Sequence, residues 1–268
     1  MMATAAATIG VFDSGVGGLS VLQHIRRTLP DACLIYVADS AHVPYGDKSP
    51  AYITQRAHTL TRFLIAQGAQ AIVIACNTAT AAAAASLREQ FALPIVGMEP
   101  AVKPAVAATK TGVVGVLATT GTLESARFAA LLGRYGDEVE IVTQGCPGLV
   151  ESVEQGDLHS AQIRELLQRY SAQLLARGAD TLILGCTHYP FLTPLLREVV
   201  GTDIALIDTG AAVARHLQRR IQTELAAQIA TNSSVSFYTS GDSAQASKIM
   251  SILWGETVEV NCLPQDSR

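Results

Sequence analysis

Two cysteines occupy matching places in the chain. Cys76 ends the apolar run Ala-Ile-Val-Ile-Ala and is followed by Asn-Thr, whereas Cys186, 110 residues later, ends the run Thr-Leu-Ile-Leu-Gly and is followed by Thr-His-Tyr-Pro. Residues 68–78 and 178–188 align without a gap. A single cysteine in an apolar run usually packs as a small hydrophobe. A matched pair, each followed by polar residues, instead indicates chemistry that the two thiols share.

The residues that follow the two cysteines carry hydrogen-bonding groups. They are Asn77, Thr78, Thr187 and His188. Their amide and hydroxyl groups suit carboxylate oxygens, and the histidine is a candidate acid or base. Cys76, Cys186 and His188 could also converge on zinc, but the sequence contains no CxxC or HxxxH pair, so we expect no metal. The same lack of CxxC disfavours a dithiol redox site.

Two turns offer groups for a small charged ligand. The glycine-rich turn Phe-Asp-Ser-Gly-Val-Gly-Gly begins at Phe12 and leads into a helical pattern, whose first N–H groups can hold an anion. It is not a dinucleotide fingerprint, because Asp13 would stand where the pyrophosphate lies. Asp13 suits an ammonium group or a proton relay, or it caps the turn, while Ser14 suits a carboxylate. In the loop Val-Pro-Tyr-Gly, the amides of Tyr45 and Gly46 could bind another carboxylate.

Short apolar runs alternate with longer helical patterns along the chain. The runs are residues 8–12, 33–38, 71–75, 95–97, 113–117, 138–142, 181–185 and 204–207, and the helical patterns include residues 18–28, 50–67, 123–135, 160–177 and 210–230. Most runs are continuously apolar, as in strands buried on both faces of a parallel sheet. This alternation predicts doubly wound α/β architecture.

An internal repeat indicates two related α/β units. Besides the cysteine segments, residues 9–14 resemble 114–119 and residues 95–99 resemble 204–208, in the same order. Ligands of open α/β sheets bind beyond the carboxyl ends of the strands. We therefore expect Cys76 and Cys186 to approach one cleft from opposite sides.

The composition is that of an ordinary globular protein. Of 268 residues, 49% are hydrophobic and 16% charged, and the net charge of −4 without a basic run disfavours a nucleic-acid partner. The first residues lack the charge and apolar core of a signal peptide, and no stretch approaches the roughly 20 apolar residues of a membrane span. Five cysteines are an odd number. We expect reduced thiols and a soluble cytoplasmic protein without a membrane partner.

Four motifs resemble those of the glutamate racemases, in the order of that family. They are Phe-Asp-Ser-Gly-Val-Gly-Gly-Leu-Ser, Val-Pro-Tyr-Gly, Ala-Cys-Asn-Thr and Leu-Gly-Cys-Thr-His-Tyr-Pro, and the likeness extends from Ile9 to about Leu263. The resemblance implies two pseudo-symmetric doubly wound α/β domains with mainly parallel sheets and an active site in the interdomain cleft. The first domain would comprise residues 1–97 and 209–268, and the second residues 98–208.

The same resemblance implies an activity and a place in metabolism. The protein would interconvert L- and D-glutamate without a cofactor and supply D-glutamate for peptidoglycan, and hence for cell-wall biogenesis and cell shape. Its only expected small-molecule partner is glutamate, and a homodimer is common in that family.

Residue roles also follow from the resemblance. Cys76 and Cys186 would be the catalytic pair, assisted by Asp13, Glu154 and His188. The expected substrate-binding residues are Asp13, Ser14, Tyr45, Gly46, Asn77, Thr78, Thr187 and His188. The segment 146–156 departs from the family pattern by placing Glu151 and Ser152 where apolar residues are usual. Spacing to Gly156 favours Glu154 as the assisting carboxylate, and Glu151 is the alternative.

A racemase of this kind needs a base on each face of the α-carbon. A free thiol has a pKa of roughly 8.5, so forming a thiolate at neutral pH costs about 2 kcal/mol. A nearby histidine or helix N-terminus can offset that cost. By resemblance, Cys76 acts on D-glutamate beside Asp13, and Cys186 acts on L-glutamate beside His188 and Glu154.

Three other functions compete with this interpretation. One is a racemase of the same superfamily that acts on aspartate or a hydantoin, although the two cysteine motifs with the long Asp-Ser-Gly turn favour glutamate. Another is an amino-acid-binding protein with two α/β lobes, which the paired cysteines disfavour. The third is a zinc hydrolase.

Overall fold

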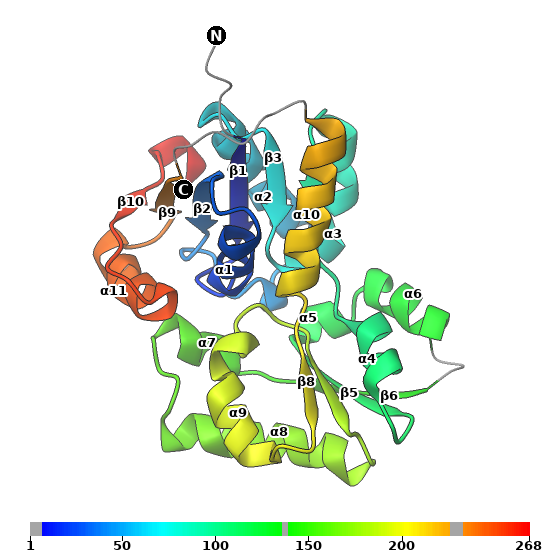
Figure 1. The fold of residues 1–268 in the computed structure, drawn as a ribbon. Helices are drawn as coiled ribbons and strands as arrows, with labels where there is room; N and C mark the ends of the chain where they lie inside the picture. The colour runs from blue at the N-terminus through cyan, green and yellow to red at the C-terminus, as the bar shows by residue number, and fades with distance from the viewer. Residues whose placement is uncertain (1–6, 136–138, 226–232) are drawn as a thin grey trace.

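The computed structural model describes residues 7–135, 139–225 and 233–268, which form two parallel sheets with helices around them (Figure 1). The strands are β1 (Thr8–Asp13), β2 (Cys33–Ala38), β3 (Ala71–Ile74), β4 (Ile95–Val96), β5 (Val113–Ala118), β6 (Glu140–Gly145), β7 (Thr181–Leu184), β8 (Ala205–Ile207), β9 (Val235–Thr239) and β10 (Val260–Cys262). The α-helices are α1 (Leu19–Thr28), α2 (Pro50–Ala66), α3 (Asn77–Gln90), α4 (Val102–Ala108), α5 (Thr120–Leu123), α6 (Ala126–Tyr135), α7 (Leu149–Glu154), α8 (Ala161–Ala176), α9 (Thr193–Val200), α10 (Gly210–Glu224) and α11 (Ser243–Trp254). Short 3₁₀ turns are η1 (Tyr45–Asp47), η2 (Tyr189–Leu192) and η3 (Gln265–Ser267).

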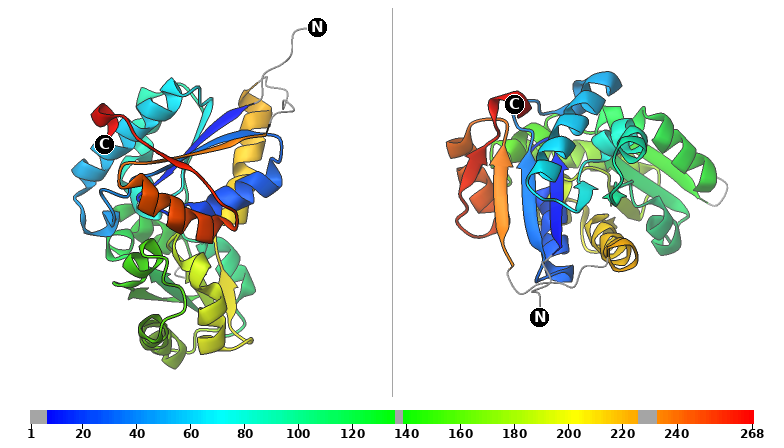
Figure 2. Two further views of the ribbon diagram at one scale, coloured as in Figure 1. Left: turned by 90° about the vertical axis from the view of Figure 1, so that its left-hand side faces the viewer. Right: turned by 90° about the horizontal axis from the view of Figure 1, so that it is seen from above.

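The two sheets repeat one topology. The larger has the order β10-β9-β2-β1-β3-β4 and the smaller the order β6-β5-β7-β8, so β2-β1-β3-β4 matches β6-β5-β7-β8 strand for strand. All described pairings are parallel. In Figure 1 the larger sheet lies above with α1, α2, α3, α10 and α11, and the smaller lies below with α4 to α9; Figure 2 shows the two units from the side and from above. The predicted α/β class is confirmed, with sheets that are wholly parallel.

Strand β1 is buried on both faces, which explains its continuous apolar sequence. Ile9 and Val11 belong to a core cluster that includes residues of α1 and α10, whereas Phe12 belongs to a second cluster with residues of α2 and α3. Alternate side chains of one strand therefore fill two separate cores, as parallel sheets covered on both faces require.

One inner strand of each sheet contains a glycine that lets a helix lie close to the sheet. A β-carbon on Gly10 of β1 would lie 2.9 Å from the β-carbon of Leu64 in α2. Gly115 occupies the equivalent place in β5, where an added β-carbon would lie 2.9 Å from a methyl group of Leu174 in α8. The repeat thus conserves a packing contact between the two units as well as the cysteines.

The structure also departs from the prediction in places. β9, which pairs with β2, and β10, which pairs with β9, were not predicted. β9 mixes Ser and Thr with its apolar residues, and β10 is a short edge strand with two exposed residues. β6 starts at Glu140 and continues beyond the predicted run to Gly145. Of the helix expected over 210–230, α10 accounts for the part to Glu224, and positions 226–230 lie outside the described residues, as does position 138. Among the described helices, none is long and apolar enough to cross a membrane.

The close glycine contacts lead to a test of packing. We expect Gly10→Ala and Gly115→Ala each to lower the free energy of unfolding by about 1–3 kcal/mol, because the added methyl group overpacks a filled core. Gly133→Ala in α6 is the matched control, since its β-carbon meets nothing within 4 Å, and it should raise stability by roughly 0.5–1 kcal/mol. Urea unfolding measures all three. Equal effects of the three substitutions would contradict the packing argument.

Candidate functional site

A narrow cavity lies where the carboxyl ends of β1 and β3 meet those of β5 and β7. Its lining residues are Ser14, Pro44, Tyr45, Gly46, Cys76, Asn77, Thr78, Thr119, Thr122, Val150, Gly185, Cys186, Thr187 and His188. All the site residues predicted from the sequence line it except Asp13 and Glu154, which lie directly behind it. The cavity encloses about 20 Å³ of free space, room for roughly one water molecule. No lysine or arginine lines it.

Cys76 is held at the start of a helix. It is the N-cap residue of α3, and its Sγ accepts a hydrogen bond from the N–H of Ala79 at 3.4 Å. The Oγ of Ser14 lies 3.9 Å from the same sulfur. Burial raises the pKa of the Cys76 thiol well above its usual value and the charge of Asp13 raises it further, while the bond from Ala79 lowers it. Without substrate, the structure therefore favours the protonated thiol at this position.

Asp13 is a fully buried carboxylate at the end of β1. Its oxygens accept hydrogen bonds from the N–H groups of Ser14 and Gly18, both at 2.7 Å, and from the hydroxyl of Thr187 at 3.2 Å. Burial raises its pKa, whereas the charge of His188 lowers it. Asp13 thus joins the two sheets and is a group that can exchange a proton near Cys76.

Cys186 has a histidine as its neighbour in place of a helix N-terminus. Its Sγ lies 3.6 Å from Nδ1 of His188, and Nε2 of His188 lies 2.6 Å from Oε1 of Glu154. Burial by itself lowers the pKa of His188, but the hydrogen bonds to Cys186 and Glu154 raise it, and the net pKa is well above the usual value. A protonated imidazole beside the sulfur stabilises a thiolate. Among the described residues, no group of three or more His, Cys, Asp and Glu side chains could hold a metal ion.

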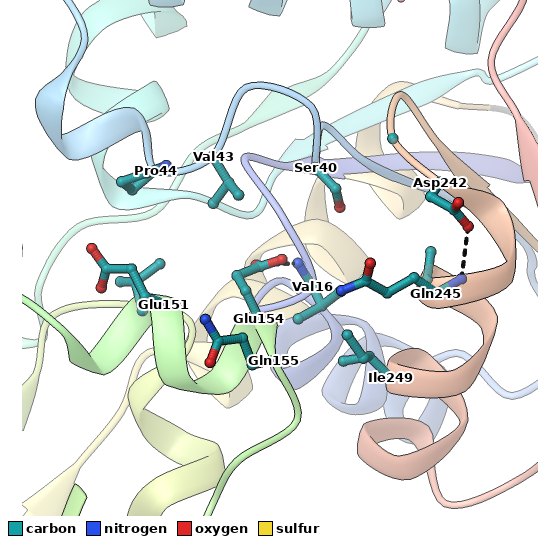
Figure 3. A pocket seen from close by; sticks show the side chains of 13 residues that line it. Val16, Ser40, Val43, Pro44, Glu151, Glu154, Gln155, Asp242, Gln245 and Ile249 are labelled. Atoms are coloured by element: carbon teal, nitrogen blue, oxygen red, sulfur yellow. Dashed lines mark hydrogen bonds between the residues drawn. The ribbon is translucent and has the colours of Figure 1, made fainter. Parts of the chain in front are cut away.

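Glu154 and His188 lie directly against the glycine-rich turn. Besides His188, Oε1 of Glu154 accepts the N–H of Val16 at 2.7 Å (Figure 3). A β-carbon on Gly15 would overlap the Glu154 carboxylate, and one on Gly17 would overlap the His188 ring. The turn therefore requires glycines, because a side chain of α7 and one of the segment after β7 occupy the space where its own side chains would be.

The structure distinguishes the two glutamates that the sequence left open. Both line a second cavity of about 300 Å³ next to the site, between α7 and α11. Figure 3 shows the carboxylate of Glu154 turned toward Val16, whereas that of Glu151 points away from it. Only Glu154 reaches the histidine beside Cys186.

Two threonines in the cavity were missed by the sequence analysis. Thr78 Oγ1 lies 3.1 Å from the hydroxyl oxygens of both Thr119 and Thr122, so three hydroxyl groups form one cluster. Thr119 follows β5 as Ser14 follows β1, and the repeat of residues 9–14 at 114–119 contained this signal. Nearby, the buried amide oxygen and nitrogen of Asn77 have no hydrogen-bond partner, so both are available to a ligand.

The raised pKa of His188 predicts a pH-dependent stability. Folding favours protonated His188, so its contribution is complete below the unfolded pKa and is lost as the pH rises through the raised folded value. We expect the free energy of unfolding of the wild type to exceed that of His188→Asn by the largest amount at a pH below the ordinary histidine pKa, and this difference to shrink as the pH rises above it. Urea unfolding across this range tests it. A difference that grows with pH would contradict the charged pair.

The chain is similar in sequence to known racemases over most of its length. A family model described as Asp/Glu/Hydantoin racemase matches residues 9–217. A glutamate racemase of Stutzerimonas stutzeri is 57% identical over 264 residues, which are 98% of this chain and 100% of that protein. A glutamate racemase of Ectopseudomonas mendocina is 60% identical over 257 residues, or 95% of this chain and 97% of that protein.

Solved structures agree with the sequence matches. The structure of a glutamate racemase isoform from Bacillus anthracis is similar with a TM-score of 0.89 and 31% identity, covering 98% of this chain and 99% of that chain. The Escherichia coli glutamate racemase in complex with L-glutamate and the activator UDP-MurNAc-ala is similar with a TM-score of 0.86 and 34% identity, covering 97% and 98%. The chain belongs to the Asp/Glu/hydantoin racemase family.

Proposed function

We propose that this chain is a glutamate racemase in which Cys76 and Cys186 are the two bases. The observation that carries the proposal is that both thiols line one cavity from the ends of β3 and β7, each beside its own acid-base group. Relatives of the same length are named glutamate racemases, and the similar structures from Escherichia coli and Francisella tularensis hold L- and D-glutamate respectively. This activity needs no cofactor in the two-base scheme.

The reaction from L- to D-glutamate begins at Cys186. Its thiolate removes the α-proton, and the Cys76 thiol delivers a proton to the opposite face. Protonated His188 stabilises the Cys186 thiolate before the transfer, and Glu154 keeps the imidazole charged. In the reverse direction Cys76 acts as the thiolate, and Asp13, whose pKa burial raises, accepts its proton so that two anions do not stand side by side.

Substrate recognition would rest on neutral donors. Because no lysine or arginine lines the cavity, the carboxylates of glutamate would bind to hydroxyl groups, the Asn77 amide and main-chain N–H groups. The predicted binding residues are therefore retained in the proposal, with Thr119 and Thr122 added. Closure around the ligand strengthens such bonds by excluding water.

The wider expectations also belong to this proposal. The division into residues 1–97 with 209–268 and residues 98–208 is supported by the strands, since β1 to β4, β9 and β10 form one sheet and β5 to β8 the other. We propose a cytoplasmic enzyme that supplies D-glutamate for peptidoglycan. A homodimer is compatible with the family, and neither nucleic acid nor a membrane is expected as a partner.

The two-base proposal makes a prediction for each thiol. Cys76→Ala and Cys186→Ala should each lower kcat/KM for racemisation by roughly 10²–10⁴-fold, the usual contribution of a positioned acid or base. Mirror symmetry fixes the equilibrium constant at unity, so kcat/KM must fall equally in both directions. In heavy water, however, Cys186→Ala should still exchange the α-proton of D-glutamate only, and Cys76→Ala that of L-glutamate only.

Circular dichroism measures racemisation, and proton NMR measures exchange. Cys262→Ala is the matched control because this thiol is exposed, and its kinetics should equal those of the wild type. The two-base scheme is wrong if either active-site variant racemises at nearly the wild-type rate.

The position of Glu154 gives a separate prediction. Glu154→Gln should lower kcat/KM roughly ten- to hundredfold, because His188 loses a hydrogen bond to a charged group. Glu151→Gln, three residues away on the same helix, should change kcat/KM less than about twofold, since Glu151 is exposed and does not line the cavity between the thiols. The same racemisation assay compares them, and a larger loss in Glu151→Gln would reverse the assignment.

A further inference from the structure

A buried ion pair lies behind the turn that faces the cavity. Arg56 of α2 binds Asp39 with two nitrogens: Nε lies 2.9 Å from Oδ2 and Nη2 lies 2.8 Å from Oδ1. The hydroxyl of Tyr45 donates to Oδ2 of the same carboxylate at 2.5 Å. Asp39 is fully buried, Tyr45 is 1% exposed and Arg56 is 7% exposed. A charged pair out of water is held only by such complete hydrogen bonding.

The remaining N–H groups of Arg56 bind the last residues of the chain. Nη2 donates to the carbonyl oxygen of Ser267 at 2.9 Å, and Nη1 donates to that of Arg268 at 3.0 Å. That segment is also fixed by Nε of Arg268, which donates to the carbonyl of Leu263 at 2.9 Å. The guanidinium thus joins three distant segments, and we call Arg56, Asp39, Tyr45 and residues 267–268 the Arg56 network.

The network ends at the wall of the cavity. Tyr45 and Gly46 belong to η1, and both line the cavity that also contains the two thiols. Burial and the charge of Asp39 raise the pKa of Tyr45, so its hydroxyl remains a donor to Asp39. On its other side η1 packs against α5, where a β-carbon on Gly121 would lie 2.8 Å from the carbonyl oxygen of Gly46. The turn η1 therefore lies between the Arg56 network on one side and α5, which packs with the smaller sheet, on the other.

Asp39 also connects the Arg56 network to the end of β1, beside the cavity. It follows β2, and its N–H donates to the carbonyl oxygen of Asp13 at 3.0 Å. Because the carboxylate of Asp39 accepts hydrogen bonds from both Tyr45 and Arg56, the ion pair links η1 to the end of β1. A small displacement of η1 would change the distance between its amides and a bound carboxylate.

We infer that Arg56 is a positioning residue for glutamate binding, acting through Asp39 and Tyr45 on the turn at Tyr45-Gly46. This inference rests on the proposed function, in which that turn binds a carboxylate of glutamate. Arg56 touches neither the thiols nor the cavity, so its loss should weaken binding and leave the proton transfers unchanged. Its contacts with residues 267–268 make that segment part of the substrate-binding apparatus.

Two variants test the inference from different ends of the network. Tyr45→Phe removes one hydroxyl and leaves the ion pair intact, and Arg56→Lys keeps the charge but loses the two-nitrogen contact with Asp39. Each should raise KM for both enantiomers about five- to tenfold, as expected for one hydrogen bond in a charged network, while kcat changes less than about twofold. The pH dependence of kcat should match the wild type. Arg164→Lys, in an exposed ion pair with Glu198, is the matched control and should leave KM unchanged.

The double variant Tyr45→Phe/Arg56→Lys shows whether the residues act as a unit. Its KM should be close to that of the more impaired single variant, because coupled residues are not additive. Unchanged KM in both single variants alongside a lowered Tm would overturn the inference, since the network would then stabilise only the fold. A fall in kcat at unchanged KM would also overturn it. A wild-type protein that does not racemise glutamate would instead refute the proposed function itself.

Discussion

The contact of Glu154 with the turn after β1 is the constraint on which the site depends. Oε1 of Glu154 accepts a hydrogen bond from the N–H of Val16, which follows β1 of the larger sheet. The same oxygen lies in hydrogen-bond contact with Nε2 of His188, which follows β7 of the smaller sheet. The Glu154 carboxylate occupies the space beside Gly15, and the His188 ring occupies the space beside Gly17. The turn can therefore have no side chain at either position. The glycines, the half-buried glutamate and the histidine therefore depend on one another, and the histidine in turn contacts Cys186.

The groups that affect the charge of the two thiols differ between the two halves of the site. Near Cys76, a helix N-terminus favours the thiolate, but burial and the Asp13 carboxylate oppose it. Near Cys186, a charged imidazole takes the role of the helix N-terminus. The two units share the sheet topology and the position of each sulfur, whereas the groups beside each sulfur differ. Different groups beside the two thiols suit racemisation, because its two directions start from opposite faces of the same carbon.

The sequence predicted the architecture well because the decisive signals were local. Continuous apolar runs and the repeat led directly to two parallel sheets of matching topology, and Cys76 and Cys186 lie at equivalent strand ends. β9 and β10 were missed because neither has an apolar run, and both are recruited to the edge of a sheet formed by distant residues. Nor does any motif near Tyr45 indicate that its hydroxyl faces Asp39, since that pairing requires Arg56 from another helix.

The small size of the cavity between the thiols has a kinetic consequence. A space that holds roughly one water molecule is too small for glutamate, so each turnover must include a separation of the walls and their return. In the proposed reaction, closed walls leave no room for bulk water beside the carbanion, so a proton on either sulfur reaches solvent only through the neighbouring acid-base groups or after the walls separate. The same tightness that protects the intermediate therefore makes entry and release candidates for the slowest steps of the cycle.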